Sequence, residues 1–84
     1  MQDGLVVSLP SAAGRRRAVL DWLAGRFEPG RSYTEQQVNA ELRARIAAGA
    51  TGVDHLALRR YLVDEGFLDR RDGRYWRAGG TFEV

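Results

Sequence analysis

The chain has 84 residues, enough for one small domain built around a single core. It has no Cys and a single His, His55, and no spacing of possible ligands resembles an established metal motif. We therefore expect neither a disulfide framework nor a metal site. The 13 basic residues, all Arg, face 11 acidic residues, and the net charge of +2 is too small to indicate a nucleic-acid partner by itself.

Membrane insertion and secretion are not expected from this sequence. No apolar run approaches the roughly 20 residues that cross a bilayer. The N-terminus also lacks the basic start and apolar core of a signal peptide. Together with the lack of Cys, these features predict a cytoplasmic protein without membrane contact.

The first 14 residues predict a short N-terminal strand and a flexible lead. Residues 5–9 (LVVSL) are strand-like, Pro10 ends any ladder that they form, and the residues that follow are small up to Gly14. We place the main domain at residues 15–78 and a tail at residues 79–84.

From Arg15 the apolar residues follow a helical period. Val19, Leu23 and Phe27 lie four residues apart, which is the spacing of an amphipathic helix. The sequence EPG at residues 28–30 stops this pattern. A helix is therefore predicted from Arg15 to near Phe27.

A second helix is predicted to begin at Thr34. Gln37 follows three residues later, so the two side chains can form a capping box in which each accepts from the other's backbone amide. Tyr33 and Val38 stand where a hydrophobic staple would hold this turn. We assign all four residues a structural role.

A third helix follows the small residues at 47–52 (AAGATG). Either Thr51 or Asp54 can cap its N-terminus. Gly66 is suited to the left-handed conformation that often ends a helix. The predicted helix therefore runs from this cap to Gly66.

A two-stranded hairpin is predicted at the C-terminal end. Residues 67–70 and 74–77 flank a connection centred on Asp72-Gly73, a pair that favours a tight hairpin turn. The predicted fold is α+β: a winged helix-turn-helix of three helices followed by a two-stranded β wing, with a short N-terminal strand. The expected core consists of Val19, Leu23, Phe27, Val38, Leu42, Ile46, Leu58, Leu62, Leu68 and Trp76.

Three stretches carry a family resemblance: DGLVVSLP, VLDWLAGRFEPGRSYTEQQVNAEL and LRRYLVDEGFLDRRDGRYWR. In this order, from about Asp3 to Arg77, they resemble the bacterial family known as domain of unknown function 2087. Members of that family often follow an ArsR-type or similar helix-turn-helix domain in transcription regulators. The resemblance thus implies a regulatory setting and no established biochemical activity. We expect no such reader domain before residue 1, and so expect the chain to act alone or with a reader on a separate chain.

The third helix is the candidate for contact with DNA bases. On a helical wheel, Ala57 and Arg60 fall on the side away from the apolar arc. Arg60 can bind guanine with two hydrogen bonds, and the small Ala57 lets the backbone approach the groove. The alternative is that Arg60 pairs with Asp64 one turn away on a solvated surface. Residues 53–66 hold two Arg and three acidic residues, a net charge of −1 that does not favour DNA.

The hairpin is the stronger candidate for phosphate contact. Residues 67–77 hold four Arg and two Asp, a net charge of +2, and we select Arg71 and Arg74 as the phosphate ligands. An ordinary solvated hairpin tip is the alternative. Arg15, Arg16 and Arg17 are further phosphate candidates, or else a solvated face. Because three cations oppose the dipole at a helix start, the first helix could also begin earlier, near Ser11.

Other notable residues are predicted to be structural. Arg59 falls inside the apolar arc, so its guanidinium should bond carboxylates or helix-end carbonyls while its stem packs on Trp or Tyr rings. Trp22, Tyr75 and Trp76 could stack on unpaired bases, but they are better explained as core residues.

Two hypotheses of function remain, and neither is an enzyme. Asp64 and Glu65 point about 100° apart on a helix, and no phosphate-binding glycine motif is present, so neither catalysis nor a cofactor is expected. In the first hypothesis the chain binds duplex DNA as a transcription regulator, as a homodimer. In the second it is a protein interaction or dimerisation module, with residues 5–9 available for strand pairing.

Overall fold

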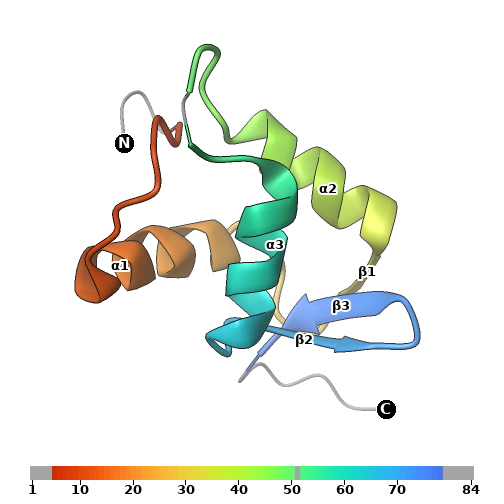
Figure 1. Ribbon diagram of the computed structural model, residues 1–84. Helices are drawn as coiled ribbons and strands as arrows, with labels where there is room; N and C mark the ends of the chain where they lie inside the picture. The colour runs from red at the N-terminus through yellow and green to blue at the C-terminus, as the bar shows by residue number, and fades with distance from the viewer. Residues whose placement is uncertain (1–4, 51, 79–84) are drawn as a thin grey trace.

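Three helices and a small antiparallel sheet make up the α+β fold in Figure 1. The structure is a computed structural model that describes residues 5–50 and 52–78. In chain order its elements are α1 (Ala13–Ala24), β1 (Ser32–Thr34), α2 (Glu35–Ala44), α3 (His55–Asp64), β2 (Leu68–Arg71) and β3 (Arg74–Arg77). Helix α3 packs on both α1 and α2. No helix within the described ranges combines the length and apolar character needed to cross a membrane.

Helix α1 begins and ends earlier than the apolar spacing predicts. It starts at Ala13, near the alternative start at Ser11, so the three Arg occupy its first two turns. After Ala24 the hydrogen bonds change to the 3₁₀ type: the Arg26 and Phe27 amides donate to the carbonyls three residues before them, at 2.9 and 3.1 Å. This tighter pattern is common where a helix ends. Phe27 is therefore buried in a turn and not in the helix.

The capping box of α2 is present. Thr34 Oγ1 accepts from the Gln37 amide at 3.1 Å, and Gln37 Oε1 accepts from the Thr34 amide at 2.8 Å. Tyr33 and Val38, the two residues of the proposed staple, are both buried. The start of α2 thus follows directly from its sequence.

Helix α3 is closed at both ends by local contacts. Asp54 Oδ1 accepts from the Ala57 amide at 2.8 Å, so Asp54 is the N-cap. Thr51, the other candidate cap, lies outside the described residues. Gly66 has a φ of 82°, the left-handed conformation expected just after the helix.

The sheet contains one strand more than predicted. Its order is β1-β3-β2, and β1 pairs with β3 so that Tyr33 lies opposite Tyr75. Strands β2 and β3 form the expected hairpin, and Asp72 and Gly73 have φ values of 52° and 76°. Two successive positive values are those of the type I′ turn that Asp-Gly favours. The connection before α2 is therefore the third strand and not a loop.

The N-terminal strand predicted at residues 5–9 is not present as a ladder. Val6 alone forms an isolated parallel bridge with Ile46, just after α2. Its amide donates to the Arg45 carbonyl at 2.7 Å, and its carbonyl accepts from the Ala47 amide at 2.8 Å. The last carbonyls of a helix have no partner inside it, so the Arg45 carbonyl at the end of α2 can accept from Val6. Val6 itself is fully buried and its backbone groups are bonded, so this residue is not free for pairing with a partner strand.

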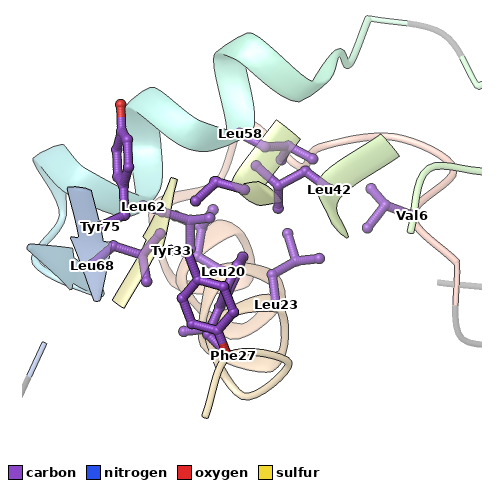
Figure 2. Close-up of a cluster of buried hydrophobic side chains, with 12 residues drawn as sticks. Val6, Leu20, Leu23, Phe27, Tyr33, Leu42, Leu58, Leu62, Leu68 and Tyr75 are labelled. Atoms are coloured by element: carbon purple, nitrogen blue, oxygen red, sulfur yellow. The ribbon is translucent and has the colours of Figure 1, made fainter. Parts of the chain in front are cut away.

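The core lies between the helices and one face of the sheet, as Figure 2 shows for its principal side chains. Seven of the ten expected residues are buried, and Val19, Ile46 and Trp76 are only partly so. In two cases the neighbouring residue is buried instead: Leu20 in place of Val19, and Tyr75 in place of Trp76. The remaining buried apolar residues are Val6, Ala24 and Tyr33.

Candidate nucleic-acid interface

A surface hollow of about 510 Å³ lies between the outer face of α3 and the hairpin. We call it the α3–hairpin hollow. It is lined by Asp54, Leu56, Ala57, Arg59, Arg60, Val63, Asp64, Arg70 and Tyr75. Thus α3 supplies most of its wall, β2 supplies Arg70, and β3 supplies Tyr75.

Arg60 and Ala57, the candidates for base contact, lie together in this hollow. The Arg60 side chain is exposed and makes no hydrogen bond or ion pair with any described residue. The alternative pairing with Asp64 is not observed, although Asp64 lines the same hollow and is also exposed. The Arg60 guanidinium is therefore available to a ligand from outside.

The hairpin tip carries Arg71 and Arg74, the phosphate candidates. Arg71 Nε is 3.8 Å from the Asp72 carboxylate, but both side chains are more than four-fifths exposed, so this pair holds Arg71 only weakly. Arg74 is exposed and has no ion pair among the described residues. Arg70, one residue before Arg71, is exposed too and lies over the Tyr75 ring, with its Cζ 5.7 Å from the ring centroid.

The Arg run of α1 is divided between a structural and a solvated role. Arg16 Nε donates to Glu65 Oε2 at 2.8 Å, and Arg17 Nη1 is 3.4 Å from both Glu65 Oε1 and the Glu65 carbonyl. Arg16 also lies over the Tyr61 ring, and Arg17 over the Phe67 ring. Both cations therefore tie α1 to the C-terminal end of α3, where they also complement the helix dipole.

Arg15 has no such partner, but its position separates it from the hairpin tip. It is exposed and forms no ion pair with a described residue. In Figure 1, α1 and the hairpin tip lie on opposite sides of α3. The phosphate candidates of α1 and of the hairpin thus do not gather on one patch.

Arg59 makes polar contacts with a neighbouring helix and packs on a Tyr ring, as its position inside the apolar arc of the helical wheel predicts. Its Nη1 donates to Asn39 Oδ1 at 2.7 Å and lies 3.1 Å from Glu35 Oε1, both on α2. Its Cζ is 5.9 Å from the centroid of the Tyr75 ring, and its side chain is only 18% exposed. Arg59 therefore connects α3 to both α2 and the sheet.

The charge of the hollow is mixed. Three Arg line it against two Asp, and one of those Arg, Arg59, is already paired with Glu35 on α2. Leu56 is 51% exposed at the same place. This balance weakens long-range attraction of a polyanion, so contact with DNA would depend on the individual free Arg side chains and the hairpin.

Comparison with known proteins identifies the family. Residues 6–77, most of the chain, match the family described as "Uncharacterized protein conserved in bacteria (DUF2087)". The chain belongs to this family. No curated protein and no solved structure matches it.

The residue types that bind metals do not cluster in the described part of this DUF2087 chain. No three His, Cys, Asp or Glu side chains within residues 5–50 and 52–78 lie close enough to hold a metal ion. The one His, His55, has its Nε2 3.3 Å from Arg43 Nη2, between α3 and α2.

Sequence reasoning missed two features of the candidate site, Arg70 and the hydroxyl of Tyr75. Arg70 was counted only in the charge of the hairpin, although strand alternation relative to Leu68 could have placed it beside the helices. Tyr75 was assigned to the core, and it is buried, but its hydroxyl oxygen has no hydrogen-bond partner among the described residues. No sequence signal distinguishes that hydroxyl from the one on Tyr33, which accepts from the Glu28 amide at 2.7 Å.

Proposed function

We propose that this chain is a winged-helix transcription regulator that binds duplex DNA, with α3 in the major groove and the hairpin as the wing. The order α1, β1, α2, α3, β2, β3 is that of a winged helix, and β1 completes the wing sheet. One observation carries the proposal. Ala57 and Arg60, the latter without an ion pair among the described residues, face outward from α3 into the same hollow that Arg70 enters from the hairpin.

Each part of this face has a role in the proposal. Arg60 reads a base edge, since a guanidinium can donate two hydrogen bonds to guanine. Arg71 and Arg74 bind backbone phosphates and fix the position of α3 in the groove. Arg16 and Arg17 hold α1 to α3 and take no part in binding, whereas the exposed Arg15 remains a secondary phosphate ligand.

The working unit in this proposal is a cytoplasmic homodimer. A single α3 of ten residues supplies few base contacts, and specific sites normally require more than one such helix. A two-fold dimer should therefore select a palindromic site with half-sites about one helical turn, roughly 10 base pairs, apart.

Selection of binding sites from a pool of random duplexes tests the proposal. The wild type should enrich a defined site, and Arg60→Ala should bind that site about 1–3 kcal/mol more weakly and lose its preference at one base pair. Arg26→Ala is the matched control, because Arg26 is exposed in the turn after α1 and its guanidinium lies over the Trp22 ring, outside the hollow. Equal enrichment of the same site by Arg60→Ala would contradict the base-reading role.

A protein partner is the second candidate for the same face. It is favoured by Leu56, the one large apolar side chain that is exposed in the described part of the chain, and by the acidic residues Asp54 and Asp64 beside it. Exposed apolar surface rimmed by mixed charge is typical of protein interaction sites. Enrichment of no duplex in the selection would favour this candidate.

A further inference from the structure

The hydroxyl of Tyr75 is a buried polar group without a hydrogen-bond partner in the described ranges. The residue is 1% exposed, and its Oη makes no hydrogen bond to any described residue. Figure 2 shows the ring standing on β3 and running along the side of α3, with the hydroxyl at the end away from the strand. Tyr75 is also the one β3 residue that lines the α3–hairpin hollow.

Such a hydroxyl is unusual, because buried tyrosine hydroxyls normally find a partner and an unpaired one costs free energy. The same sheet provides a direct comparison. Tyr33, opposite Tyr75 on the neighbouring strand, accepts a hydrogen bond from the Glu28 amide at 2.7 Å. Phenylalanine would fill the Tyr75 position without this cost, so the hydroxyl points to a partner beyond the described residues, such as a ligand in the hollow.

Two guanidinium groups converge on the Tyr75 ring. The Cζ atoms of Arg59 and Arg70 lie 5.9 and 5.7 Å from its centroid. Arg59 Nη1 contacts both Asn39 and Glu35 of α2, and these contacts fix the side chain. The other two guanidinium nitrogens, Nε and Nη2, have no partner among the described residues. Arg70 is exposed and forms no ion pair in the described ranges, so it can turn from the ring toward a ligand.

We propose that Tyr75 Oη, Arg70 and Arg59 bind one phosphate group in the α3–hairpin hollow. A phosphate presents several strong acceptor oxygens, which matches a hydroxyl donor on a ring that two guanidinium groups approach. Asp64, exposed in the same hollow, opposes this anion, so the site depends on hydrogen-bond geometry and not on net charge. A backbone phosphate of DNA is the source if the proposed function holds, and a small phosphate ester is the other source.

The test compares Tyr75→Phe with wild type in two titrations. Inorganic phosphate is followed by the NMR shifts of the Ala57, Arg60 and Arg70 amides, against sodium chloride at equal ionic strength. A mixed-sequence duplex is followed by fluorescence anisotropy. Tyr75→Phe should weaken binding about tenfold, the value of one hydrogen bond to a charged group. Its melting temperature without ligand should be unchanged or raised.

Tyr33→Phe is the matched control for the loss of a hydroxyl. It should melt at a lower temperature, because it removes a bonded hydroxyl, and it should bind both probes as the wild type does. Equal binding of both probes by Tyr75→Phe and wild type would overturn the phosphate site and leave the DNA proposal standing.

The two probes also separate the two proposals. Binding of inorganic phosphate that depends on Tyr75, without any binding of the duplex, would support the site, identify a small phosphate ester as its ligand and overturn the DNA proposal. Failure of the wild type to bind either probe would overturn both.

Discussion

Arg59 and Arg60 are neighbours in the chain with opposite surroundings. Arg59 is fixed by Glu35 and Asn39 of α2, whereas Arg60 is exposed and unpaired among the described residues. The cause is the helical rotation of about 100° per residue, which turns one side chain toward α2 and the next away from it. A helical wheel of the sequence is enough to predict that Arg59 is enclosed and Arg60 exposed. The actual partners of Arg59 could not be predicted, because they depend on how α2 crosses α3.

At the same scale, Thr34 offers a direct test of the capping box. Thr34→Ala removes the acceptor of the Gln37 amide and should lower the free energy of unfolding by about 1 kcal/mol. Urea denaturation measures this loss. Thr34→Ser keeps the hydroxyl and should stay close to the wild type. If the Ser variant is as unstable as the Ala variant, the methyl group and not the capping bond stabilises this turn.

At the scale of elements, α1 is joined to the end of α3 by Glu65. This carboxylate is 16% exposed and accepts from Arg16 and Arg17 across 49 and 48 residues of sequence. Charge pairs of this kind contribute more when they form a partly buried network than when they are isolated on a surface. Glu65 therefore connects two helices that are distant in the chain.

The contribution of this connection can be measured by neutralising the carboxylate. Glu65→Gln should lower the free energy of unfolding by about 1 kcal/mol, and by less at high salt. Glu28→Gln is the control, because Glu28 is 73% exposed and its carboxylate lies 3.8 Å from Arg31. That variant should stay within about 0.5 kcal/mol of wild type. Equal losses in the two variants would contradict a special role for Glu65.

The predictions from sequence succeeded where local chemistry decides and failed where packing decides. Four local features that single residues or pairs determine are all present: the capping box of Thr34 and Gln37, the N-cap Asp54, the helix-ending Gly66 and the Asp72-Gly73 turn. Strand β1 was missed because three residues carry no periodicity, and only pairing with β3 makes them a strand.

The errors in the core have a similar origin. The apolar stripe of α1 allows either Val19 or Leu20 inward, and only contact with α3 selects Leu20. In β3, Tyr75 and Trp76 point to opposite faces, and the larger ring was expected inside. Pairing with β1 and β2 places Tyr75 on the helix side instead. The candidate site changed accordingly, since it gained Tyr75 and Arg70 and lost Arg16 and Arg17.

At the scale of the whole molecule, the Arg residues divide into internal ties and free cations. Arg16 and Arg17 of α1, and Arg45 directly after α2, are paired with carboxylates. On the outer α3 face and the hairpin, Arg60, Arg70 and Arg74 have no ion pair in the described part of the chain, and Arg71 has only its exposed contact with Asp72. This segregation is a second support for the proposal that the α3–hairpin face binds DNA.

The most direct test is the salt dependence of binding to a mixed-sequence DNA duplex. Arg71→Ala/Arg74→Ala should weaken binding and reduce the slope of log affinity against log salt by about two units, one for each lost phosphate contact. The charge-matched control is Arg26→Ala/Arg31→Ala, whose residues line a separate hollow beside α2 and should leave the slope unchanged. Equal slopes in both double variants, or no binding of the wild type at low salt, would contradict DNA binding by this face.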